Sequence, residues 1–176
     1  NIHLEKTIKS LKYKFDVGFN NSKYIQELNN TIQTNTNNNY DYEIAIETLF
    51  DKFPTIEIGL KQDFGNFTAS ANTSKFVTTE PFINIDYNFL EDFIFNFDYT
   101  KSNYQNKTLG QKNTYEIANA TLSYKKEDSA WSYKITAQNL FNTQFKQSNS
   151  FSDFLISDTR TFILPRILMF SIGYNL

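Results

Sequence analysis

The sequence contains no cysteine, one histidine and five glycines in 176 residues. The absence of cysteine excludes disulfides and thiolate chemistry, and it suits a protein that crosses an oxidising compartment. His3 alone is too little for a zinc site, and it is a poor basis for a Ser-His-Asp or Cys-His centre. Five glycines leave no glycine-rich phosphate loop. We therefore expect no catalytic residue, no cofactor and no metal site.

Charge and hydropathy exclude further classes. The 17 lysines and arginines nearly balance 19 aspartates and glutamates, so no basic field favours nucleic acid. No run approaches the roughly 18 apolar residues that a transmembrane helix needs. The first residues, "NIHLEKTIKS", have no initiator Met and no apolar signal-peptide core. This start favours a mature chain or an excised piece of a longer one.

Aromatic residues and asparagine are abundant, with 18 Phe, 11 Tyr and 22 Asn. Apolar and polar residues alternate with a period of two along most of the chain, which is typical of β-strands with two different faces. The alternation predicts eight strands at residues 7–19, 40–50, 55–64, 77–89, 93–104, 114–126, 131–141 and 163–176.

Long and short connections alternate strictly between these expected strands. Long polar segments follow the first, third, fifth and seventh strands, whereas the links "DKFP", "LED" and "EDSA" are short. All long loops would then lie at one end of an antiparallel up-and-down sheet. Long extracellular loops and short periplasmic turns are the arrangement of outer-membrane barrels.

The two faces of the expected strands support a transmembrane β-barrel. Aromatic residues gather near the strand ends, at Phe19, Tyr40 and Tyr99 and again at Phe50, Phe89, Phe93, Trp131 and Tyr174, as in the aromatic girdles of such barrels. We expect Leu11, Tyr13, Phe15, Ile44, Phe95, Tyr133, Phe170 and Ile172 to face lipid. We expect Lys12, Lys14, Glu43, Glu47, Glu57, Lys61, Asp98 and Lys134 to line an aqueous lumen. Lys12 and Lys14 would stand beside Glu43 and Glu47 in a cross-strand charge ladder.

The end of the chain, "ITAQNLFNTQF" followed by "TFILPRILMFSIGYNL", resembles the C-terminus of TonB-dependent receptors of the Gram-negative outer membrane. The similar elements are an "NLFN" turn at residues 139–142, the pair Pro165 and Arg166, and a last alternating strand with Gly173 and Tyr174. Upstream strands fit only generically, and Leu176 stands where such strands commonly end in Phe.

The resemblance implies a 22-stranded barrel that encloses a plug domain. Such receptors take up siderophores, metal chelates, vitamins or glycans with energy relayed by a periplasmic coupling protein. Residues 1–176 would form a single barrel segment in contact with outer-membrane lipid, without the plug and the remaining strands.

Two alternatives stay open at the level of sequence. One is a free-standing eight-stranded outer-membrane barrel with a structural or adhesive role, whose first and last strands would pair. The other is a soluble, lipocalin-like, lipid-binding barrel whose apolar faces point inward.

Individual ligand contacts are less defined. Glu43 and Glu47 suit a solvated lumen wall better than acid–base chemistry. Tyr24, Tyr104, Phe151 and Phe154 lie in the expected long loops, where they either contact a ligand or pack within the loops.

Overall fold

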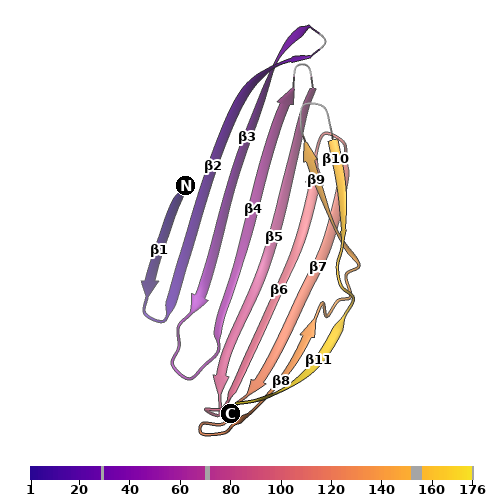
Figure 1. The fold of residues 1–176 in the computed structure, drawn as a ribbon. Helices are drawn as coiled ribbons and strands as arrows, with labels where there is room; N and C mark the ends of the chain where they lie inside the picture. Colours follow the sequence, from indigo (N-terminus) through magenta and orange to yellow (C-terminus); the bar gives the residue numbers. More distant parts are fainter. Residues whose placement is uncertain (29, 70–71, 152–155, 176) are drawn as a thin grey trace.

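A computed structural model describes residues 1–28, 30–69, 72–151 and 156–175. The chain is all-β, and its main element is an antiparallel up-and-down sheet in which consecutive strands are neighbours (Figure 1). Its nine strands are β1 (Ile2–Ile8), β2 (Leu11–Leu28), β3 (Thr31–Thr48), β4 (Thr55–Ala69), β5 (Asn72–Phe89), β6 (Phe93–Asn106), β7 (Gln111–Tyr124), β8 (Trp131–Gln138) and β11 (Ile167–Tyr174). The described residues contain no helix long and apolar enough to cross a bilayer.

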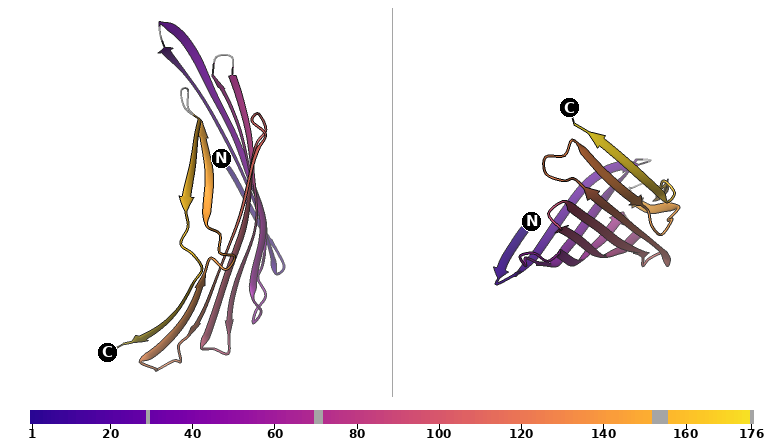
Figure 2. Two further views of the ribbon diagram at one scale, coloured as in Figure 1. Left: turned by 90° about the vertical axis from the view of Figure 1, so that its right-hand side faces the viewer. Right: turned by 90° about the horizontal axis from the view of Figure 1, so that it is seen from below.

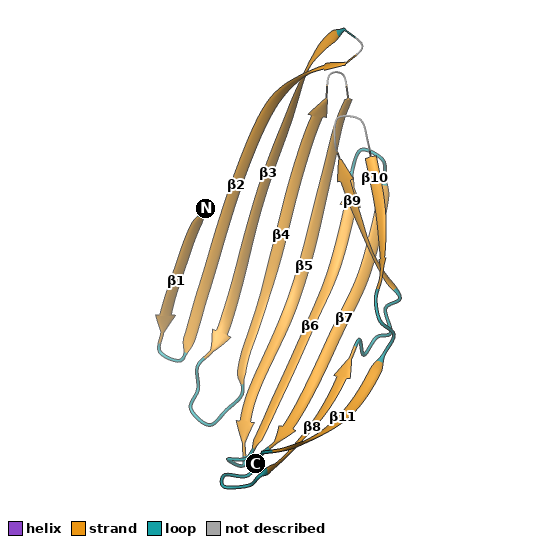
Figure 3. Cartoon of the chain, in the orientation of Figure 1, coloured by secondary structure: helices purple, strands orange, loops and turns teal. Residues whose placement is uncertain are grey.

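A separate two-stranded hairpin, β9 (Phe145–Phe151) and β10 (Ile156–Phe162), lies between β8 and β11 in sequence (Figure 3). The main sheet is strongly curved and bends round from β1 to β11 (Figure 2). Within the described residues β1 pairs only with β2, and β11 pairs only with β8. The sheet is therefore open, with one edge at each end of the strand order.

The number of strands differs from the predicted eight because the segment 7–19 is not one strand. The chain turns at Lys9 and Ser10, which separates β1 from β2 and brings Ile8 opposite Leu11. Lys9 takes the left-handed conformation, with φ of 56°. Tight hairpin turns usually place Gly, Asn or Asp in that conformation, so this turn carries no sequence signal.

The predicted long loops are also wrong, because most of their residues extend the strands. The ladder of β2 and β3 runs without interruption from Leu11 and Thr48 to Leu28 and Thr31. Likewise β4 pairs with β5 as far as Ala69 and Asn72, and β6 with β7 as far as Asn106 and Gln111. These upper parts, at the top of Figure 1, are polar hairpins rather than irregular loops.

The predicted division into two faces is confirmed. The pairing registers put Leu11, Tyr13, Phe15, Ile44, Phe95, Tyr133, Phe170 and Ile172 on one face, here called the apolar face. Lys12, Lys14, Glu43, Glu47, Glu57, Lys61, Asp98 and Lys134 lie on the opposite, polar face.

The sheet has almost no apolar core. Among the described residues, the buried hydrophobic side chains are those of Ala45, Phe67 and Ala118. Large apolar side chains of the apolar face are exposed instead, for example Ile44 at 47%, Ile58 at 56% and Phe170 at 63%. A water-soluble domain of this size usually buries most such side chains, so the exposure of this face is unusual for one.

The apolar face is apolar only in the lower half of the sheet. On β6, Phe93, Phe95, Phe97 and Tyr99 are followed on the same face by Lys101, Asn103 and Gln105. On β2 the apolar stretch runs from Leu11 to Phe19, about 26 Å along the strand, or about 20 Å of height at a tilt near 40°. We call this lower part the apolar band.

Aromatic rings mark both borders of the apolar band. At the lower border, rings follow one another across five strands from Tyr87 through Phe89, Phe93, Tyr124 and Tyr133 to Phe170, with successive centroids 4.7–6.4 Å apart. Trp131 and Tyr174 add a pair 4.8 Å apart. At the upper border, Phe19 stacks on Tyr40 at 4.8 Å. This is the geometry expected of two aromatic girdles.

Candidate functional site

The lower half of the polar face carries a network of ion pairs across four strands. Lys12 Nζ lies 3.0 Å from Glu5 Oε1 of β1 and 3.9 Å from Glu47 Oε2 of β3. His3 Nδ1 lies 2.5 Å from Asp16 Oδ1. The predicted charge ladder is thus confirmed for Lys12 and Glu47, which are direct register partners.

Lys14 is the centre of this network. Glu47 and Glu57 are direct register partners, so two like charges face each other on β3 and β4. Lys14 Nζ lies 2.7 Å from Glu47 and 2.6 Å from Glu57, with each of the three side chains about one fifth exposed. To reach β4, the Lys14 side chain extends past its own register partner Ala45, which is 1% exposed.

Glu43 corrects one detail of the predicted ladder. It does not stand opposite Lys12 or Lys14, because its register partners are Asp16 on β2 and Lys61 on β4. The contact of Lys14 with Glu57, two strands away, was not predictable from alternation. Alternation gives the face on which a side chain lies but not the strand that the side chain contacts.

Polar contacts continue from the ion pairs toward β8. Asn84 Nδ2 donates to Glu57 Oε2 at 3.0 Å, and Asn119 Nδ2 donates to Asp98 Oδ2 at 2.8 Å. Asn119 Oδ1 in turn accepts the backbone N–H of Asn139 at 2.9 Å. These hydrogen bonds link side chains of the polar face from β4 to the end of β8.

We infer that the polar face is the concave face of the curved sheet, because Lys14 of β2 reaches Glu57 of β4 across the strand between them. Side chains on the inside of a curved sheet converge, which explains how Lys14 of β2 contacts Glu57 of β4. A Cβ at Gly18, Gly59 or Gly65, all on this face, would lie within 2.3 Å of a neighbouring side chain. The lower concave surface is acidic, since the carboxylates of Glu5, Asp16, Asp41, Glu43, Glu47, Glu57, Asp63, Glu80, Asp86 and Asp98 outnumber Lys12, Lys14, Lys61 and Lys134.

The upper half of the polar face is chemically different. The three register rows directly above Asp41 and Asp63 contain no charged side chain whose position is described, and we call them the amide patch. The patch consists of Asn20, Asn39, Gly65, Phe76, Asn106 and Gln111, then Ser22, Asn37, Phe67 and Ser74, then Tyr24 and Asn35. Of the aromatic residues proposed from sequence, Tyr24 lies in this patch and Tyr104 at its lower border, while the side chains of Phe151 and Phe154 lie outside the described residues.

The "NLFN" segment forms a compact turn that ends β8. Asn139 and Asn142 both have left-handed conformations, with φ of 51° and 55°. The 4% exposed Asn139 side chain donates to the carbonyl oxygens of Thr143 and Leu164 at 2.8 and 2.9 Å and accepts the Thr143 N–H at 2.8 Å. This side chain therefore ties the turn to the segment that precedes β11.

The turn also contacts the Pro165–Arg166 pair directly. Asn142 Oδ1 accepts the backbone N–H of Arg166 at 3.1 Å. The two motifs that were grouped on sequence, 23 positions apart at their nearest ends, thus meet in space and set the start of β11. The sequence motifs identified the turn and the Pro165–Arg166 pair as important. They did not show that the side chains of Asn139 and Asn142 connect the turn to this segment.

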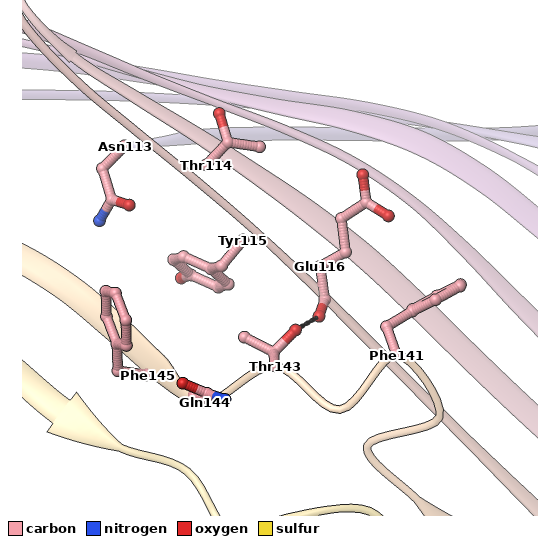
Figure 4. Close-up of a pocket in the computed structure, with 8 residues that line it drawn as sticks. All are labelled: Asn113, Thr114, Tyr115, Glu116, Phe141, Thr143, Gln144 and Phe145. Carbon is pink, nitrogen blue, oxygen red and sulfur yellow. Dashed lines mark hydrogen bonds between the residues drawn. The ribbon is translucent and has the colours of Figure 1, made fainter.

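An open pocket of about 430 Å³ lies beside the upper part of β7 (Figure 4). It exists because β8 pairs with β7 only from Ala120 to Tyr124, and the chain then crosses the free edge of β7. The lining residues are Asn113, Thr114, Tyr115, Glu116, Phe141, Thr143, Gln144 and Phe145. Thr143 donates its hydroxyl to the backbone carbonyl of Glu116. Alternation gave no signal for this pocket, which depends on where β8 ends.

Among the described residues, no group of three or more His, Asp or Glu side chains is placed to hold a metal ion. Comparisons of the chain with protein-family models, with curated proteins and with solved structures found no match.

Proposed function

We propose that this sheet is part of the transmembrane β-barrel of a TonB-dependent receptor in a Gram-negative outer membrane. In that role it takes part in uptake of a ligand, which can be a siderophore, a metal chelate, a vitamin or a glycan. The proposal rests first on the apolar band, whose large side chains are exposed on the convex face. A bilayer removes the cost of exposing them to water.

The polar face supports the same proposal. In lipid a charged side chain costs several kcal/mol, whereas in an aqueous lumen it costs little. The ion pairs of Lys12 and Lys14 lie on the concave face, away from the apolar band. An aqueous interior and a lipid exterior account for both faces at once.

The open edges favour a segment of a larger barrel over a free-standing small one. Hydrocarbon cannot satisfy backbone N–H and C=O groups, so a membrane sheet must close. Here β1 and β11 lie at the edges of the described sheet and do not pair with each other. Additional strands, with a plug domain and a periplasmic coupling protein as partners, would complete the receptor. The contact between Asn142 and Arg166 gives the resembling motifs a common structural role.

A lipocalin-like barrel receives less support. Such a barrel converges on its apolar face, around a lipid cavity. In this sheet the converging side chains belong to the polar face, as the contact between Lys14 and Glu57 illustrates.

Adjacent residues of β8 provide a test of the orientation. Lys134 lies on the polar face and Ile135 on the apolar face, 44% exposed. Because the chain has no cysteine, Lys134→Cys and Ile135→Cys each introduce the one thiol of residues 1–176, and the unsubstituted protein is the labelling control. In outer membranes that contain the intact protein, a water-soluble maleimide should label the Lys134→Cys variant and spare Ile135→Cys. A bimane label on Ile135→Cys in lipid vesicles should be quenched by a nitroxide-bearing lipid. Equal labelling of both variants in membranes would contradict the proposal.

A further inference from the structure

The absence of charge in the amide patch limits the ligands that it suits. Anionic ligands such as ferric chelates and phosphates are bound in proteins by Arg and Lys. None of the described side chains of the patch is charged, and the row below it contains Asp41 and Asp63. An anionic ligand would meet no cation in the patch and two carboxylates beneath it.

The patch also has unused hydrogen-bonding capacity. Asn35 and Asn106 are both 0% exposed. Both amide atoms of Asn35, Nδ2 of Asn106, Oδ1 of Asn39 and Oγ of Ser74 have no hydrogen-bond partner among the described residues. Buried amides are costly to leave unpaired, and each offers a donor and an acceptor. Ligand hydroxyl groups, which also both donate and accept, match this set.

Aromatic rings lie among these amides. A Cβ at Gly65 would stand 1.8 Å from Cζ of Phe76, so only glycine lets this ring lie over β4. Phe76 also stacks on Tyr104, with centroids 6.3 Å apart. Its register partners are Gly65 on one side and Asn106 on the other. Aromatic faces flanked by amides suit a ligand with apolar C–H surfaces and hydroxyl edges.

The pocket beside β7 continues the same chemistry at the border of the patch. Asn113 is the register partner of Tyr104 and lines the pocket together with Tyr115, Phe145 and Gln144. In Figure 4 the carboxylate of the lining Glu116 points away from the other labelled side chains, and Lys101 Nζ holds it at 2.7 Å. The pocket therefore adds amides and aromatic rings, with the Glu116 carboxylate paired to Lys101 and the Lys146 ammonium group over the Tyr115 ring, 5.7 Å from its centroid.

We propose that the amide patch on the concave face, together with the adjoining pocket at the edge of β7, binds a neutral, polyhydroxylated ligand, namely an oligosaccharide. The inference rests on the proposed function, because it takes this face as the wall of a ligand pathway. It selects one of the ligand classes that the fold alone leaves open.

Saturation-transfer NMR and calorimetry on the intact protein in detergent micelles test this ligand class. The probes are maltohexaose and xylohexaose as neutral hexamers and hexagalacturonate as an anionic hexamer of similar size. At least one neutral hexamer should bind, about tenfold or more tightly than hexagalacturonate. Tighter binding of hexagalacturonate, or no binding of either neutral hexamer, would overturn the proposal.

Two phenylalanines on β5 give a matched pair of variants. Phe76 covers Gly65 in the patch, and Phe82 covers Gly59 in the charged lower half, where a Cβ would lie 2.3 Å from its ring. Phe76→Leu should weaken the neutral hexamer about tenfold and Phe82→Leu less than about twofold, since only Phe76 would contact the ligand. Equal weakening by both variants would assign the effect to packing and reject the site.

Asn106→Asp keeps the size of the side chain and the Oδ1 that accepts the N–H groups of Thr108 and Leu109, and it provides a second variant if Phe76→Leu does not fold. It removes Nδ2, a donor without a partner among the described residues, so this variant should also weaken the neutral hexamer about tenfold. Unchanged affinity would argue against the patch. The maleimide experiment on Lys134→Cys and Ile135→Cys is independent of any ligand. If it gives the expected orientation while no neutral hexamer binds, the ligand class is wrong and the membrane barrel stands.

Discussion

The lower and upper halves of this sheet share the same strands and differ in almost every side chain. In the lower half, the convex face is apolar and the concave face holds ion pairs, with Lys14 between Glu47 and Glu57. In the upper half, the convex face is polar and the concave face is a neutral patch of amides and aromatic rings. The backbone ladder crosses the boundary without a break, for example along β2 and β3.

This difference separates what forms a strand from what gives a strand one apolar and one polar face. Backbone pairing is enough to continue β2 and β3 upward, where Asn, Thr and Ser are frequent. The alternation of apolar and polar residues stops where the apolar band stops. We therefore expect substitutions in the lower half to depend on lipid and on ion pairs, and those in the upper half to affect mainly ligand contacts.

The largest expected difference is between two isoleucines on the apolar face of β3. Ile44 lies in the apolar band and Ile32 lies above it, and both are exposed, at 47% and 74%. Ile44→Lys should reduce the free energy of unfolding in lipid vesicles by about 2–4 kcal/mol, the cost of a lysine near the bilayer midplane. Ile32→Lys should change it by less than about 0.5 kcal/mol.

Urea unfolding followed by the fluorescence of Trp131, the only tryptophan of the chain, measures both values. In water both positions would be exposed, and both substitutions would then be nearly neutral. Equal costs for the two variants would remove the distinction between the halves.

The next largest difference in the free energy of unfolding is expected between two asparagines with left-handed backbone conformations. Asn30, at the tip of the β2–β3 hairpin, has φ of 59°, and Asn139 has φ of 51°. Asn139→Ala should cost about 2–3 kcal/mol, because it loses three hydrogen bonds as well as the tolerance of Asn for this conformation. Asn30→Ala, which loses only the tolerance of Asn for the left-handed conformation, should cost about 1 kcal/mol or less. The same unfolding assay compares them, and a smaller cost at Asn139 would refute the role assigned to the turn.

The sequence predicted the lower half far better than the upper half. Alternation assigned Phe15 and Lys14 to the correct faces because the two faces of the strands in the lower half differ in polarity. The strand from Asn20 to Leu28 was taken for loop, since both of its faces are mostly polar and no periodicity marks it. Pairing there depends on the partner strand, which a local pattern does not contain.

Two features of the candidate sites were beyond sequence reasoning for the same reason. The reach of Lys14 to Glu57 requires a small residue, Ala45, on the strand between them. The contact between Asn142 and Arg166 joins residues 24 positions apart. Both contacts depend on how neighbouring segments are placed in space. The sequence identified the motif residues but not these contacts.

A smaller effect should follow from removing the central ammonium group of the lower half. Lys14→Met leaves Glu47 and Glu57 facing each other without a cation between them. Because these carboxylates are partly exposed to the lumen, we expect a loss of about 1–2 kcal/mol rather than the larger cost of a fully buried pair. Adding Glu47→Gln to Lys14→Met should restore part of the loss.

Lys101→Met is the matched control in the upper half. Lys101 pairs with one carboxylate, Glu116, at 2.7 Å on the convex face. The Glu116 carboxylate raises the pKa of Lys101 through a hydrogen bond and its charge, yet the pair is open to solvent. Because the pair is open to solvent, we expect Lys101→Met to cause no measurable loss in the unfolding assay. The result should not vary from pH 6 to 9, because the contribution of a raised lysine pKa is lost only above the ordinary lysine value of about 10.4. A loss as large as that of Lys14→Met would mean that both halves depend on ion pairs.

The smallest effect is expected where side chains pair across the upper hairpin. Asn21 donates an amide hydrogen to Asn38 on the convex face. Asn38→Ala should change the free energy of unfolding by about 0.5 kcal/mol or less, because exposed cross-strand pairs contribute little and the backbone ladder remains. Hydrogen exchange of the amides of β2 and β3 above Phe19 should likewise be unchanged. If this substitution instead opened the hairpin, side-chain pairing would hold the upper half together, and the strands would continue for a reason other than their backbone ladder.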